Sequence, residues 1–107
     1  MDDKTRRRLA FLAACKAGLV PTSVYSFETG RHTNMEAGAK AMIDHGTGTR
    51  FTDKYDEGRK AWWQLELTGN EFSGYDHGAG HHFSGTISGR SVQIYDHGLE
   101  RYFDYSV

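Results

Sequence analysis

The sequence predicts an α+β fold in which N-terminal helices pack on one face of an antiparallel β-meander. Three observations lead to this class: a twenty-residue repeat in the second half, a two-residue alternation of apolar side chains within it, and helix-type patterns in the first half. With 107 residues the chain is long enough for only one modest core. We therefore expect a single domain over 1–107, mainly helical over 1–47 and forming the meander over 48–107.

The repeat is defined by three copies of Tyr-Asp-x-Gly. Their tyrosines, Tyr55, Tyr75 and Tyr95, stand twenty residues apart. Each Asp is expected to open a turn by bonding the backbone ahead of it, and each Gly to take the left-handed position. Between these turns, Gly69-Asn70 and Gly89-Arg90 fit two-residue hairpins of type II′. The meander then has about six strands, near 50–55, 60–68, 71–75, 80–88, 91–95 and 100–107.

The alternation gives this sheet an apolar and a polar face. The apolar face must be covered, because so much contiguous apolar surface would otherwise drive association. The polar face carries an aromatic track, whose members are the candidate residues for binding a ligand or a partner: Trp62, Tyr75, His82, Tyr95 and Tyr102. The edge strands 50–55 and 100–107 are candidates for pairing with another protein or with a second copy of the chain.

Helix signals fill much of the first half. Asp2 or Asp3 can cap a helix that starts near Lys4 and ends at Gly18. Thr33 or Asn34 can cap a second helix, "MEAGAKAMIDH", which Gly46 stops. The piece between them allows two structures: a short helix from Pro21 to Thr29 with Gly30 as its C-terminal stop, or a hairpin in which "SVYSF" is a strand and "ETG" its turn.

A resemblance bears on this ambiguous piece. Over residues 13–34, "AACKAGLVPTSVYSFETGR" resembles the helix-turn-helix of phage repressors, matched by Ala14, Ala17, Gly18, Val24, Phe27, Glu28, Gly30 and Arg31. Residues 50–107 carry no such resemblance. In that family the recognition helix lies in the major groove of DNA. The resemblance implies contacts to base edges from Thr22, Ser23, Tyr25 and Ser26. It implies contacts to phosphates from Lys4, Arg6, Arg7, Arg8 and Arg31.

The charge distribution is uneven. Residues 1–40 hold seven Lys/Arg against four acidic residues, whereas the remainder holds six against ten. This split allows a basic N-terminal surface that meets an anionic partner such as double-stranded DNA.

The spacing of the histidines in the repeat does not predict a metal site. His77 and His97 lie two strands apart, roughly 9.5 Å, whereas zinc needs ligand atoms about 2 Å from the metal. We find no nucleophile with a base and no phosphate loop, so we expect no cofactor, no metal and no enzymatic activity. The lone Cys15 and the lack of a long apolar run favour a reducing, cytoplasmic location without membrane association.

Two functions follow. The first is a small DNA-binding or regulatory protein that uses its basic N-terminal helices. The alternative is a protein- or ligand-interaction module that uses the polar aromatic face of the sheet.

Overall fold

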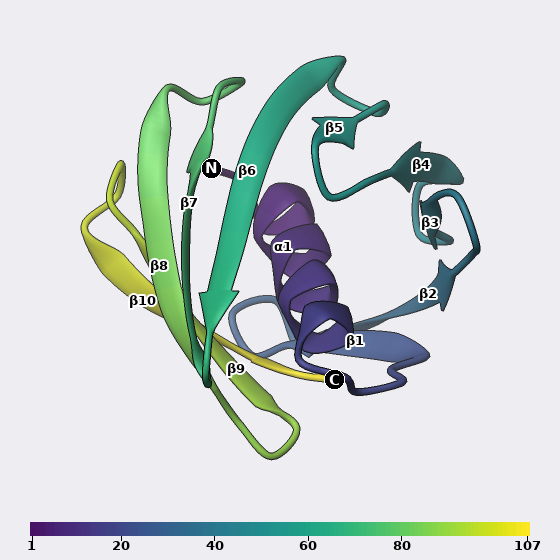
Figure 1. Cartoon of the computed structure of the whole chain (residues 1–107), viewed down its shortest axis with the longest axis horizontal. Coiled ribbons are helices and arrows are strands. Elements are labelled where there is room, and N and C mark those ends of the chain that lie inside the picture. Colours follow the sequence, from purple (N-terminus) through teal and green to yellow (C-terminus); the bar gives the residue numbers. More distant parts are fainter.

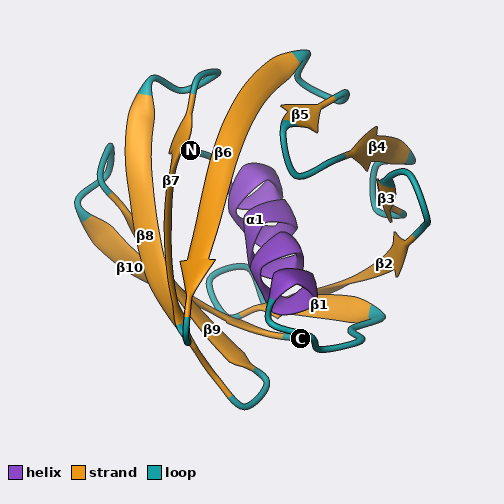
Figure 2. Ribbon diagram, viewed as in Figure 1, coloured by secondary structure: helices purple, strands orange, loops and turns teal.

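A single helix runs through the centre of a closed antiparallel barrel of ten strands in the computed structural model, which describes residues 1–107 (Figures 1 and 2). Each strand pairs with its neighbours in sequence, and β1 closes the barrel against β10. The long strands β6 to β10 curve round one side of the helix, and the shorter β3 to β5 lie on the other (Figure 1). The elements are α1 (Asp3–Lys16), β1 (Ser23–Ser26), β2 (Arg31–Ala37), β3 (Met42–Asp44), β4 (Thr49–Phe51), β5 (Tyr55–Asp56), β6 (Ala61–Thr68), β7 (Glu71–Asp76), β8 (His81–Ser88), β9 (Ser91–Asp96) and β10 (Arg101–Ser106).

The predicted α+β class is therefore wrong. The apolar face of the sheet is covered, as the alternation requires. The cover comes from closure of the sheet into a barrel around one helix, and not from helices packed on an open sheet. A barrel of about eight strands has an interior that its own side chains can fill. Ten strands enclose a wider space, and α1 occupies it (Figure 2).

The helix itself follows its sequence signals. Asp2 is the N-cap, and its Oδ1 accepts a hydrogen bond from the Thr5 N–H at 2.9 Å, which confirms the predicted start. Gly18, with φ +89°, takes the left-handed position just beyond the end. Every residue from Thr5 to Ala14 is buried, so this helix has no solvent face and is enclosed on all sides.

The hairpins of the second half also confirm the prediction. Leu67 pairs with Phe72, and Ile87 with Val92, across two-residue turns. Gly69 and Gly89 have φ of +63° and +59° while the residues after them do not, as type II′ turns require. The inward side chains predicted from the alternation form the core with the helix.

The second helix and the helix-turn-helix are wrong. Residues 23–37 form a hairpin of β1 and β2. A hairpin is the second of the two structures that the sequence allows for the piece after Gly18. "MEAGAKAMIDH" contributes the end of β2 and all of β3. Thr33 and Met35 are buried while their neighbours are exposed, a period of two that fits a strand. Pairing with neighbouring strands therefore overrides the helix propensity of Ala, Met and Glu.

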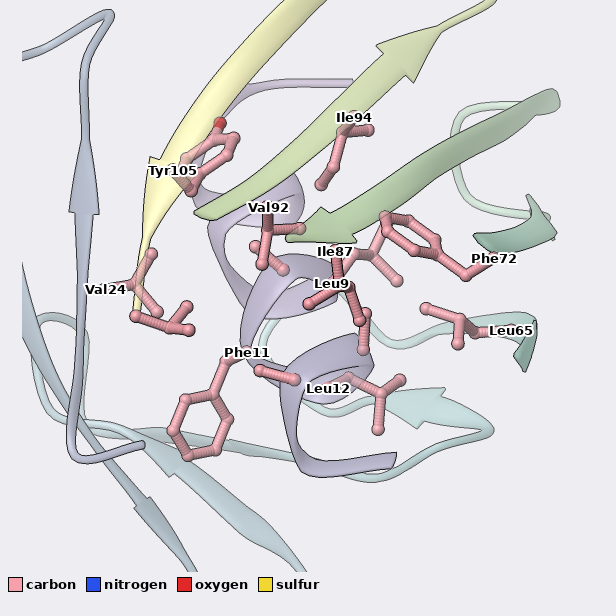
Figure 3. Packing of buried hydrophobic residues seen from close by; sticks show 14 of the residues in the cluster. Leu9, Phe11, Leu12, Val24, Leu65, Phe72, Ile87, Val92, Ile94 and Tyr105 are labelled. Atoms are coloured by element: carbon pink, nitrogen blue, oxygen red, sulfur yellow. The ribbon is translucent and has the colours of Figure 1, made fainter. Parts of the chain in front are cut away.

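The core is one cluster of nineteen buried residues around α1. Leu9, Phe11 and Leu12 of the helix pack among side chains from β1, β6, β7, β8, β9 and β10 (Figure 3). Two inward positions are glycine, and large rings lie across them. A Cβ on Gly74 would lie 2.5 Å from the Phe83 ring, and one on Gly85 would lie 2.4 Å from the Phe72 ring.

The two strands predicted as sheet edges have neighbours on both sides. β4 pairs with β3 and β5, and β10 pairs with β9 and β1. Barrel closure therefore takes up both of these edges. The fourteen-residue helix has neither the length nor the apolar character to span a membrane.

Candidate functional site

The Tyr-Asp-x-Gly repeat forms a series of similar turns. In each, the Asp Oδ1 accepts a hydrogen bond from the Gly N–H two residues ahead, at 3.1 Å for Asp56 and Asp76 and 2.9 Å for Asp96. Asp44 makes the same bond to Gly46 at 2.9 Å, so Ile43-Asp44-His45-Gly46 is a further copy that the sequence analysis missed. The predicted turn-opening role of Asp is confirmed.

The predicted left-handed position within this turn is wrong. Positive φ falls four residues after the Asp, at Gly48, Lys60, Gly80 and Glu100. The repeated glycine is needed for space instead. A Cβ on Gly98 would lie 2.5 Å from the His81 ring.

The repeated aspartates face inward, where four arginines neutralise them. We call this set the Arg–Asp cluster; it comprises Asp44, Asp56, Asp76, Asp96, Arg6, Arg7, Arg8 and Arg59. The aspartate side chains are fully buried. Arg8 bridges two of them, with Nε 2.9 Å from Asp44 and Nη1 3.0 Å from Asp56. Arg59 joins Asp56 to Asp76 at 2.9 Å each.

Arg6 occupies the other end of the cluster. It donates to Asp96 at 3.2 Å and to Glu28 at 2.9 Å, and its guanidinium lies 3.6 Å from the centroid of the Phe103 ring. Burial alone would lower the pKa of Arg6, but the hydrogen bond from its Nε to the Tyr105 hydroxyl and the nearby carboxylates raise it. The cluster thus ties the first turns of α1 to strands from around the barrel.

This cluster changes the expectation for DNA contacts. Arg6, Arg7 and Arg8 are buried and paired, so their charges are used inside the protein. Among the other predicted residues, Lys4 and Arg31 are exposed, and Thr22 is exposed just before β1. Ser23, Tyr25 and Ser26 lie on β1, and the buried Ser26 donates to Asp3 at 2.7 Å. No recognition helix presents these residues to a DNA groove, since the one helix of the protein is α1 inside the barrel.

The outer face of β6 to β10 holds the predicted aromatic track, and strand pairing arranges it in rows. The middle row crosses five strands in the order Glu66, Ser73, Ser84, Tyr95, Tyr102. The row toward the Asp-x-Gly turns is Gln64, Tyr75, His82, His97. The row on the other side is Thr68, Glu71, Thr86, Gln93, Asp104.

These rows line a shallow trough that runs across the strands. It consists of two adjoining hollows of about 490 and 390 Å³ that share Glu66, Ser73 and Ser84. The paired serines Ser73 and Ser84 form its floor because their side chains are small. Beside them, a Cβ on Gly74 would lie 1.8 Å from the Gln64 carbonyl oxygen, so only glycine allows the close approach of strands at this place.

Aromatic rings form one wall of the trough. Tyr75 and His82 have ring centroids 4.7 Å apart, as do Tyr95 and Tyr102. His77 and His97, whose role the sequence left unexplained, turn back to pack edge-on against Tyr75 and Tyr95 at 4.8 and 4.7 Å. Their imidazoles thus continue the ring stacks.

Four of the five residues predicted for the ligand site line the trough, namely Tyr75, His82, Tyr95 and Tyr102. Trp62 does not. It is 61% exposed, packs against Tyr55 at 4.6 Å between ring centroids, and lines a separate hollow with Lys54 and His77. Of the remaining lining residues, the alternation also assigns six to the polar face: Gln64, Glu66, Ser73, Ser84, Thr86 and Gln93. That Ser73 and Ser84 are adjacent follows only from the pairing of β7 with β8.

The trough is acidic. Glu66 and Glu71 are exposed, take part in none of the ion pairs of the structure, and share the trough with no Lys or Arg. No three His, Cys, Asp or Glu side chains are arranged to hold a metal ion.

Fold and site together describe a helix-filled antiparallel barrel with an acidic, aromatic trough on its outer face. Comparisons of the chain with protein-family models, curated proteins and solved structures find no match.

Proposed function

We propose that this protein is a non-enzymatic interaction module that binds an extended partner in the trough. The observation that carries the proposal is the middle row, in which two small serines separate Glu66 from the Tyr95–Tyr102 pair. Cross-strand ring pairs stabilise hairpins by themselves. The hollow above Ser73 and Ser84 gives a ligand a bed flanked by rings, hydroxyls and carboxylates.

The buried charges support a non-enzymatic role. The carboxylates and guanidinium groups of the Arg–Asp cluster pair with one another inside the barrel. In the trough, the side chains of Glu66, Glu71, His82 and His97 are exposed. Exposed side chains of this kind are available to contact a partner, whereas the buried charges already contact one another.

The test is a titration of the ¹⁵N-labelled full chain with probes of different chemistry: a cationic, an anionic and a neutral hexamer, and a short DNA duplex. At least one hexamer is expected to shift the amide signals of Ser73, Ser84 and Tyr95. Ser84→Tyr fills the floor and should abolish these shifts. Ser88→Tyr, on the same strand but outside the trough, should leave them intact.

Two results would overturn this function. One is that no hexamer moves the trough signals, or that Ser84→Tyr binds as well as the unchanged chain. The other is duplex binding that weakens as salt rises and shifts Lys4, Tyr25 and Arg31 instead, which would favour DNA binding.

A further inference from the structure

We infer that the occupant of the trough is an extended cationic peptide segment that carries Lys or Arg at both ends of the middle row. This inference rests on the proposed function and adds the chemistry of the partner. Its basis is charge complementarity between such a segment and the lining of the trough.

The carboxylates of the trough are not balanced by any Lys or Arg in its lining. Glu66 lies at one end of the floor, with Glu71 on the neighbouring strand one row away. Both side chains are exposed, and neither is neutralised by the protein. An anionic partner would meet two uncompensated carboxylates, whereas an ammonium or guanidinium group would pair with them. A neutral oligosaccharide could use the rings but would leave these charges unpaired.

The far end of the row suits a second cation. Tyr102 is 62% exposed, and its ring lies edge-on to Tyr95 with centroids 4.7 Å apart. Lys and Arg side chains are attracted to the faces of such rings. Asp104 lies in the adjacent row, where its Oδ1 accepts a hydrogen bond from Gln93 Nε2 at 3.1 Å and adds negative charge near this end.

The length of the row sets the length of the segment. From β6 to β10 there are four strand spacings, roughly 19 Å at about 4.8 Å each. An extended peptide spans this distance in about six residues at roughly 3.3 Å per residue. The hydroxyls of Ser73 and Ser84 lie beneath its middle, where they can bond to the peptide backbone.

The experiment compares hexalysine, hexaglutamate and cellohexaose as probes of the full chain. Hexalysine is expected to shift the signals of Ser73, Ser84 and Tyr95, with an affinity that falls as salt rises. The double variant Glu66→Gln/Glu71→Gln should weaken hexalysine on the order of tenfold, since each exposed ion pair contributes up to about fivefold. Tyr102→Leu should weaken it about threefold.

The matched control is Glu36→Gln/Glu57→Gln, which removes two exposed carboxylates outside the trough. Equal losses in both double variants would reveal general attraction to a polycation and overturn the inference. Trough binding by hexaglutamate or cellohexaose, but not by hexalysine, would overturn the cationic partner and leave the proposed function standing. If no probe moves the trough signals, both are overturned. Thermal unfolding of each variant confirms that it is folded.

Discussion

Asp44 shows how one buried carboxylate holds both a turn and the central helix. Its Oδ1 accepts the Gly46 N–H, while its two oxygens together accept from Arg7 and Arg8 at 2.9 to 3.1 Å. A buried pair of this kind is balanced only while both partners are present, because each charge has lost its water. The aspartates of the other repeats follow the same plan with Arg6, Arg8 and Arg59.

Replacing Asp44 by Asn should therefore destabilise the fold strongly. Asn keeps a side-chain oxygen for the Gly46 N–H but leaves the guanidinium groups of Arg7 and Arg8 without their shared countercharge. We expect the free energy of unfolding in urea to fall by about 3 to 5 kcal/mol.

The control for this change is Asp53→Asn. Asp53 is exposed and lies 3.7 Å from Lys16 in a surface ion pair, so its loss should cost less than about 1 kcal/mol. Similar losses at Asp44 and Asp53 would contradict the stabilising role of the Arg–Asp cluster.

The inward direction of the repeated aspartates could have been predicted from the sequence. Asp76 has the same parity as Phe72 and Gly74, which the alternation places on the core side. The turn chemistry of Asp-x-Gly explains the residue without burial, so the sequence analysis missed its second partner. The resemblance assigned Arg6, Arg7 and Arg8 to phosphates. Nothing local in the chain shows that they meet buried carboxylates instead.

At the scale of the elements, local patterns predicted the hairpins of the second half and the start of α1. Turn glycines and two-residue alternation act over a few residues, so they can be read without the fold. The strands β2 and β3 could not be predicted in this way. "MEAGAKAMIDH" favours a helix by composition. It is extended because its two ends pair with each other as β2 and β3, and because β3 also pairs with β4.

The trough was predicted in part. Its aromatic residues were placed on the polar face, because the alternation assigns them there. Its hollow floor depends on the register that puts Ser73 beside Ser84, and on the close approach of neighbouring backbone at Gly74 and Gly85. Both depend on how the strands pair, which no short stretch of sequence shows.

Gly74→Ala tests the close approach of the backbone at Gly74. The added Cβ would lie 1.8 Å from the Gln64 carbonyl oxygen and 2.5 Å from the Phe83 ring, so strands β6 and β7 must move apart. We expect the free energy of unfolding to fall by about 2 to 3 kcal/mol, as overpacking with backbone shifts does.

Gly48→Asn is the control, because Gly48 has φ +71° and no atom within 4 Å of an added Cβ. Asn tolerates this conformation, so the loss should stay below about 1 kcal/mol. Equal stability of Gly74→Ala and the unchanged chain would contradict the close approach of strands at this position.

For the whole molecule, the central helix replaces the covering helices that the sequence predicted. The requirement for a cover was correct, since the apolar face is buried. What the sequence could not show is that ten strands would close and that one helix of fourteen residues would supply the cover. Closure needs the β1–β10 contact between residues about eighty apart, and such long-range pairing has no local signal.

This architecture predicts a fold that loses stability in acid. Burial alone would raise the pKa of Asp96, but the charge and hydrogen bond of the terminal ammonium group, with the N–H groups of Leu99 and Gly98, lower it. The pKa of Asp2 is also lowered, because hydrogen bonds to Thr5 outweigh burial. The unfolded chain therefore binds more protons in acid, and the free energy of unfolding should decrease as the pH falls below about 5.

Urea unfolding at about pH 7, 5 and 3 measures this loss. Asp96→Asn should lower the free energy of unfolding at neutral pH and make its decrease toward pH 3 less steep. The alkaline side has the opposite origin. Burial and the neighbouring Asp3 raise the pKa of Tyr105, so the folded state keeps a proton that the unfolded chain releases. Stability should then also decline above about pH 10, and Tyr105→Phe should weaken that decline. A free energy of unfolding that is unchanged between about pH 7 and 3 would contradict the lowered pKa of Asp96 in the folded state.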